Sequence, residues 1–205
     1  IEQKCLDESS LVVTVSPGIS RLLGQHCKTK IITLPQGYVA AQERNRKNSC
    51  TGDYVLYAGS LAYGRDLSVI LSAIKMVSES TTNKIKLVYC GEHNDIVQKQ
   101  ALSVNASEFL EVRGYLKEKE ALKLSEDSIC NLIIISPGYE YAYPGKLFDL
   151  ISTGKPICVL ADRESEAGSL VDKYELGFNI VNQGVDNVAK SLLSIINSGG
   201  RSNIN

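Results

Sequence analysis

The chain has 205 residues, enough for one or two small domains but not for a large multidomain enzyme. Apolar residues make up 43% and charged residues 22%, a composition that excludes a disordered tail, a collagen-like fibre and a coiled coil. The 22 basic and 23 acidic residues nearly cancel, so no polybasic field exists for nucleic acid or an anionic membrane, and we expect no nucleic-acid partner. Apolar runs such as 132–135 are far too short to span a bilayer.

The chain opens on Ile1 without a signal-peptide pattern, and we expect it to be part of a longer protein. Its 6 cysteines are widely spaced and form no C-x-x-C pair, which argues against a zinc site or a thioredoxin-like motif. Cys90 and Cys158 lie in apolar runs, where a free thiol behaves as a small hydrophobe. We therefore predict reduced thiols, no metal site and a cytoplasmic location.

The first 38 residues hold a short strand–helix–strand pattern. Strands are predicted at 11–15 and 30–34, and a helix at 19–23 is introduced by Ser16 as N-cap and Pro17 at the first helical position. This is too little for a core of its own, so residues 1–38 are interpreted as the end of an incomplete N-terminal domain. Residues 39–53 are polar and lack periodicity, which is typical of a linker.

Residues 54–197 alternate apolar runs with helical segments and form one predicted domain, followed by a tail at 198–205. The predicted strands are 55–58, 85–90, 109–112, 132–136, 156–160 and 178–181. The predicted helices are 67–77, 95–104, 117–127, 146–152, 164–174 and 185–196.

Continuously apolar strands that alternate with helices indicate an α/β fold with a parallel sheet covered on both faces. The simplest topology is a doubly wound, Rossmann-like sheet. Ligands of such sheets bind beyond the carboxyl ends of the strands. The candidate turns follow Ala58, Cys90, Val112, Ser136 and Leu160.

Residues suited to a nucleotide diphosphate follow two of these strands. Its negative oxygens need close backbone approach, a helix amino end and cations. Gly59 and Ser60 supply the first requirement, and Arg65 and Lys146 supply positive charge at two loop–helix junctions. Asp149 lies on the same helix face as Lys146 and can accept both hydrogen bonds of a ribose diol.

Several segments, in this order, resemble the nucleotide-sugar-dependent glycosyltransferases of the two-Rossmann-domain (GT-B) type, in particular retaining family 4. Residues 143–149 (YPGKLFD) and 152–157 (STGKPI) resemble the family pattern P-x-K-x-x-E-x-x-x-x-G-K-P-V and carry the most specific signal. The other segments that resemble family motifs are 11–16, 32–37, 57–61 followed by Arg65, 88–91 and 112–116.

The resemblance implies the C-terminal, donor-binding domain of a hexosyltransferase that is retaining and independent of metal. Its substrate would be a UDP- or GDP-linked sugar, with no other cofactor, used in polysaccharide or glycan biosynthesis. A glycan or lipid-linked acceptor would bind the missing N-terminal domain, peripheral membrane association of the full-length protein stays open, and the fragment alone would be inactive. The implied catalytic residues are Arg65 and Lys146, and the implied donor-binding residues are Gly59, Ser60, Gly91, Tyr115, Leu116, Pro144, Gly145 and Asp149.

The sequence departs from the family pattern at three positions. Ser60 stands where the first turn carries arginine, Asp149 replaces the later glutamate, and Tyr141 stands at the earlier acid, with Glu140 one place out of register. His93 follows a strand end, where a surface role and a place near the ligand are both open.

Three other functions compete with this interpretation. One alternative is a non-catalytic sugar-nucleotide-binding domain, which the altered acid pair favours. Another is a sugar-nucleotide epimerase of the same architecture, which needs more catalytic acids at the strand ends. A dinucleotide-dependent dehydrogenase is disfavoured, because residues 59–64 lack the middle glycine of G-x-G-x-x-G.

Overall fold

The computed structural model describes residues 2–37, 52–62, 64–82, 84–181 and 184–198. The helices are α1 (Glu2–Glu8), α2 (Pro17–Gly24), α3 (Ser68–Ser80), α4 (Asn94–Ser103), α5 (Glu118–Asp127), α6 (Lys146–Ser152), α7 (Glu166–Lys173) and α8 (Val185–Asn197), with a 3₁₀ turn η1 (Ser107–Phe109). The strands are β1 (Val12–Thr14), β2 (Ile31–Thr33), β3 (Tyr54–Ala58), β4 (Lys86–Cys90), β5 (Leu110–Val112), β6 (Cys130–Ile134), β7 (Ile157–Ala161) and β8 (Gly177–Val181).

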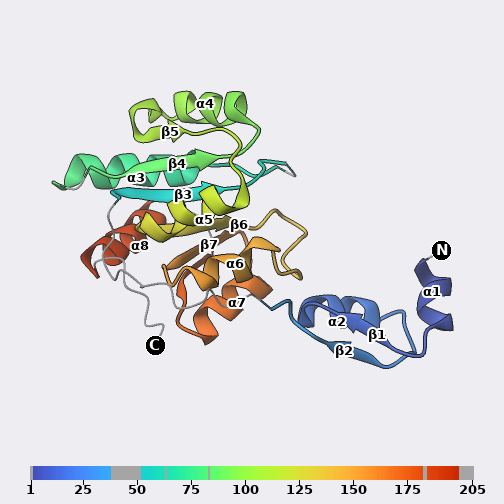
Figure 1. The fold of residues 1–205 in the computed structure, drawn as a ribbon. Coiled ribbons are helices and arrows are strands. Elements are labelled where there is room, and N and C mark those ends of the chain that lie inside the picture. The colour runs from blue at the N-terminus through green and yellow to red at the C-terminus, as the bar shows by residue number, and fades with distance from the viewer. Residues whose placement is uncertain (1, 38–51, 63, 83, 182–183, 199–205) are drawn as a thin grey trace.

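Six strands form one parallel sheet in the order β5-β4-β3-β6-β7-β8, which confirms the predicted doubly wound, Rossmann-like α/β fold (Figure 1). From β3 the chain adds β4 and β5 on one side of the sheet. It then crosses back to β6, which lies on the other side of β3, and adds β7 and β8 beyond it. β3 pairs with β4 over its whole length but with β6 only at Val55 and Leu56. The order reverses between β3 and β6, and crevices at such reversals are where doubly wound sheets bind ligands.

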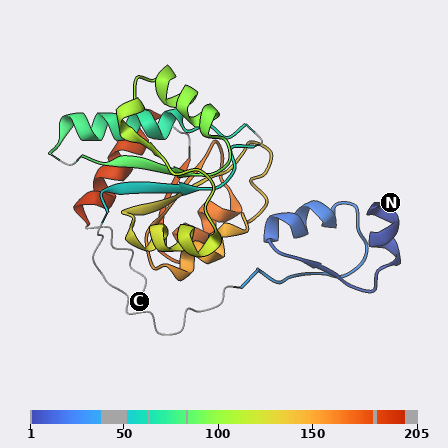
Figure 2. The same cartoon turned by 45° about the horizontal axis from the view of Figure 1, so that its top comes forward.

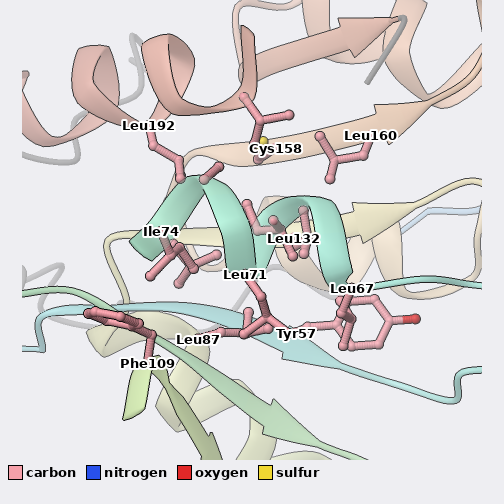
Figure 3. Close-up of a cluster of buried hydrophobic side chains, with 14 of the residues drawn as sticks. Tyr57, Leu67, Leu71, Ile74, Leu87, Phe109, Leu132, Cys158, Leu160 and Leu192 are labelled. Carbon is pink, nitrogen blue, oxygen red and sulfur yellow. The ribbon is translucent and has the colours of Figure 1, made fainter. Parts of the chain in front are cut away.

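Helices cover both faces of this sheet because alternate strand residues point to opposite sides. Val55 and Tyr57 belong to the larger core cluster, which α3, α4 and α8 cover. Figure 3 shows Leu71 and Ile74 of α3 in this cluster, between strand residues such as Leu87 and Leu132. On the opposite face, α6 and α7 pack on β6 and β7, and α5 contributes Leu124 to a smaller cluster around Leu56, Val88 and Cys90.

The N-terminal segment forms a separate parallel pair, β1 and β2, connected through α2 (Figure 2). The predicted cap is confirmed, since the Ser16 hydroxyl accepts a hydrogen bond from Ile19 N and Pro17 opens the helix. Helix α1 was not predicted. The predicted domain boundary at 38 and the linker at 39–53 fall mostly on residues 38–51, outside the described residues, and stay predictions.

The amino end of α2 rests on the loop between β6 and α6. Ser16 Oγ donates to Tyr141 O at 2.5 Å, and Arg21 forms an ion pair with Glu166 on α7. A Cβ at Gly18 would lie 2.5 Å from Tyr141 O, so only glycine allows this approach. Among the helices of the described part of the chain, none is both long and apolar enough to cross a membrane.

Candidate functional site

A cavity of about 390 Å³ opens at the carboxyl ends of β3 and β4, beside the point where the strand order reverses. Its size suits a small-molecule ligand. The residues that line it come from the two strand ends, the loop after β5, and helices α5 and α6. They are Leu56, Ala58, Gly59, Ser60, Cys90, Gly91, Glu92, Tyr115, Leu116, Glu118, Ala121, Leu122, Ser125, Lys146, Asp149 and Leu150.

The turn after β3 forms one wall of the cavity. Gly59 has a φ of 154°, and its N–H donates to Cys90 O at 2.8 Å, which ties the ends of β3 and β4 together. The Tyr57 hydroxyl donates to Ser60 O at 2.9 Å and fixes the other end of the turn. A Cβ at position 59 would lie 3.2 Å from Lys146 Nζ, so the glycine gives that ammonium room against the backbone.

Lys146 reaches this turn from the first position of α6. Its Nζ donates to Ala58 O at 3.0 Å and lies 4.1 Å from the centre of the Tyr57 ring. Burial, and secondly the positive charge of Arg65, lower the pKa of Lys146 from 10.5 to about 7. An anionic ligand would strongly stabilise the charged form of Lys146, because its negative charge offsets both the cost of burial and the repulsion from Arg65.

Arg65 binds the same turn, since its Nη1 donates to Ser60 O at 3.1 Å. Two cations that are 81 positions apart in the sequence, Arg65 and Lys146, therefore meet at the Gly59–Ser60 turn. Arg65 itself is not among the residues that line the cavity. Burial raises the pKa of Tyr57 to about 12, which keeps its hydroxyl protonated as the donor that shapes this turn.

Asp149 lies one helical turn beyond Lys146 and lines the same cavity. Partial burial, and secondly the carboxylate of Glu118, raise the pKa of Asp149. Pro144 and Gly145 are absent from the lining residues in the described part of the chain. They instead precede α6, with Leu147 N donating to Pro144 O at 2.9 Å and Gly145 as the N-cap residue.

The far end of the cavity is apolar and lies against α5. Leu116 packs on the cluster of Leu56, Val88 and Cys90, while Tyr115 is 72% exposed at the rim. Glu92 and Glu118 also line the cavity, and we did not predict them as site residues. Their only sequence signal is that each closely follows a predicted ligand-binding residue, Gly91 or Leu116.

The two candidates for the earlier family acid lie outside the cavity lining. Glu140 Oε1 accepts from Gly138 N at 3.1 Å and is bound within its own loop. The Tyr141 carbonyl accepts from Ser16, and its ring stacks on Tyr139 with centroids 6.3 Å apart. This loop is therefore organised around the contact with α2.

No group of three or more His, Cys, Asp or Glu side chains in the described part of the chain could hold a metal ion. Among the cysteines that the structure describes, Cys5, Cys27, Cys90 and Cys158 are free thiols. Burial raises the pKa of Cys90 to about 11, so this cavity thiol stays protonated near neutral pH.

No protein-family model and no curated protein sequence matches this chain. Several solved structures are similar to this chain. TarM from S. aureus, crystallised with UDP among its ligands, superposes with a TM-score of 0.72 at 15% identity, over 95% of this chain and 38% of TarM. Sucrose-phosphate synthase from Thermosynechococcus elongatus gives a TM-score of 0.74 at 15% identity, over 98% of this chain and 53% of the synthase.

Anabaena HepE, solved in complex with UDP and glucose, gives a TM-score of 0.68 at 12% identity, over 94% of this chain and 55% of HepE. The chain thus spans only about two fifths to just over half of these proteins. Such identities establish the fold and not the activity. The chain has the Rossmann-like fold of the C-terminal half of GT-B glycosyltransferases.

Proposed function

We propose that the cavity binds a nucleotide-diphosphate sugar and that the chain is the donor-binding half of a glycosyltransferase. The observation that carries this proposal is that Lys146 and Asp149 line one cavity at the reversal of the sheet, while Arg65 binds the Gly59–Ser60 turn that forms its wall. UDP in the TarM and HepE complexes supports the same ligand class.

Each part of the ligand has a complementary part of the cavity. The diphosphate would lie over the Gly59–Ser60 turn, where Lys146 exchanges its bond to Ala58 O for a phosphate oxygen. The Asp149 carboxylate would accept from the ribose hydroxyls. The base would lie between the apolar wall near Leu116 and the exposed ring of Tyr115.

This arrangement can stabilise a leaving group. In transfer, the bond between the anomeric carbon and the distal phosphate oxygen breaks, a bond to an acceptor oxygen forms, and negative charge grows on the departing diphosphate. Lys146 and Arg65 would neutralise that charge, a role that a metal ion fills in other enzymes. With retention of configuration, the leaving diphosphate would take the acceptor's proton on the same face of the sugar.

The acceptor would be a glycan or a lipid-linked glycan held mainly by residues outside this chain, in a cytoplasmic pathway of polysaccharide synthesis. A peripheral association of the whole protein with a membrane fits a lipid-linked acceptor. On this proposal the chain binds donor nucleotide and does not transfer sugar by itself.

Calorimetric titration of the chain with UDP, GDP and NAD tests this proposal. We expect a nucleoside diphosphate to bind, NAD not to bind, and Lys146→Ala to abolish diphosphate binding. Lys119→Ala, which removes an exposed lysine of α5 outside the cavity, is the matched control and should leave binding intact. Binding of NAD alone, or equal diphosphate affinity in Lys146→Ala and the unchanged chain, would refute the proposal.

A further inference from the structure

The turns after β3 and β4 are locked against each other. Gly59 N donates to Cys90 O at 2.8 Å, which joins the turn after β3 to the end of β4, and Gly91 N donates to Gly114 O at 3.0 Å, which joins the turn after β4 to the loop after β5. A Cβ at position 91 would overlap the Gly59 carbonyl oxygen, so the close approach requires glycine there. Whatever follows Gly91 is thereby held beside the Gly59–Ser60 turn.

His93 is the residue that this approach brings to the turn. Its Nδ1 lies 3.5 Å from Ser60 Oγ, and Ser60 lines the cavity. Its backbone N–H donates to the Tyr89 hydroxyl at 3.2 Å, which fixes the base of the side chain. His93 also occupies the N-cap position of α4, yet its side chain makes no capping hydrogen bond. Helix capping therefore does not account for the position of the imidazole.

Position 60 explains why a further donor is useful at this turn. Ser60 is short and neutral, so it brings no positive charge to the turn. The Ser60 hydroxyl already accepts from Ala62 N at 3.0 Å, so it is oriented within its own turn. An imidazole beside it can donate a ring N–H whether neutral or charged, and adds positive charge when protonated.

We propose that His93 binds a phosphate oxygen of a nucleoside diphosphate that lies over the Gly59–Ser60 turn. With Arg65 and Lys146, it is the third group at this turn that can carry positive charge. The inference rests on the proposed function and adds a ligand-binding residue to it.

The test uses whichever of UDP and GDP binds more tightly, together with its parent nucleoside, measured by calorimetry and by NMR shift titration. His93→Ala should weaken diphosphate binding by roughly fivefold to tenfold, the size expected for one exposed hydrogen bond to a charged group, and leave nucleoside binding unchanged. His26→Ala removes the chain's other histidine, which is exposed in the N-terminal segment, and should change neither.

Rescue separates a phosphate contact from a structural role. In the His93→Ala background, Ser60→Arg should restore diphosphate affinity, because the arginine at position 60 supplies a cation at the turn in place of the imidazole. His93→Lys should likewise keep most of the affinity. A merely structural histidine would show a lowered melting temperature and no rescue by either substitution.

The outcomes distinguish the two proposals. If the unchanged chain binds no nucleoside diphosphate, the proposed function fails and this inference fails with it. If the diphosphate binds and His93→Ala binds it equally well, or loses the nucleoside to the same extent, only the assignment of His93 is overturned.

Discussion

Replacing Lys146 by methionine should stabilise the chain at pH 6 while it removes nucleotide binding. The ammonium of Lys146 is partly buried and lies near Arg65, and among the residues that the structure describes its favourable contacts are the Ala58 carbonyl and the Tyr57 ring. The position is thus costly without a ligand, which is expected for a cation whose function is to hold an anion.

The magnitude follows from the pKa of Lys146, which falls from 10.5 to about 7 in the folded chain. Between these values the unfolded chain holds one more proton, so stability rises with pH through this window and the penalty is greatest below pH 7. The full shift corresponds to about 5 kcal/mol, which solvent screening of a partly buried group reduces to about 2–3 kcal/mol. Loss of the bond to Ala58 O costs about 1 kcal/mol, which leaves a net gain of about 1–2 kcal/mol at pH 6.

Urea unfolding of Lys146→Met and the unchanged chain at pH 6 and pH 9 measures this effect. The gain should be largest at pH 6 and shrink towards zero at pH 9, where the penalty in the unchanged chain is about half as large. Lys119→Met, on the exposed surface of α5, should show no such trend. A Lys146→Met variant that is less stable than the unchanged chain at pH 6, or a difference independent of pH, would refute the reasoning.

Four further predictions concern the same site and its support. Calorimetry should show nucleotide affinity falling as the pH rises from 7 to 9, because Lys146, with a pKa of about 7, loses its proton; a flat profile would contradict this. Asp149→Asn should weaken UDP about tenfold but barely affect its 2′,3′-dideoxy analogue, and equal losses would exclude a ribose contact. Gly91→Ala should cost about 1–3 kcal/mol in urea unfolding, because the new methyl overlaps the Gly59 carbonyl, and an unchanged midpoint would argue against this close approach. Gly18→Ala should lower hydrogen-exchange protection in α2, whose first turn rests on Tyr141, and unchanged protection would show that this contact is absent in solution.

The fold could be predicted because its strands are continuously apolar and its helices periodic. Helix α6 begins at Lys146 as predicted, directly after the Pro144–Gly145 pair. The start of β6 was wrong by two residues because Asn131 interrupts the apolar run. In the structure its Oδ1 accepts from the Ser125 hydroxyl, so a polar residue is tolerated in a buried strand.

Two other elements depend on contacts that local patterns do not reveal. Helix α1 has no buried residue and no apolar stripe, and a hydrogen bond from Gln3 to His26 O ties it to the segment after α2. Gly177 was interpreted as a stop signal after the preceding helix but begins β8. A Cβ there would overlap the backbone of Ile157 in the neighbouring strand.

The candidate site likewise has some features that the sequence reveals and others that depend on tertiary contacts. Glycines at strand ends and a lysine–acid pair at helical spacing are visible in the sequence, and Gly59, Lys146 and Asp149 do line one cavity. Glu92 and Glu118 line the cavity because of the way α5 and the turn after β4 face it. That orientation is decided by tertiary packing and not by local sequence. The lowered pKa of Lys146 likewise depends on tertiary placement.

A crystal structure of the chain with a nucleoside diphosphate tests the central claim most directly. We predict that a phosphate oxygen will take the place of Ala58 O as the partner of Lys146 Nζ and that the ribose hydroxyls will donate to the Asp149 carboxylate. A diphosphate bound elsewhere on the molecule, with Lys146 still bonded to Ala58 O, would contradict the account.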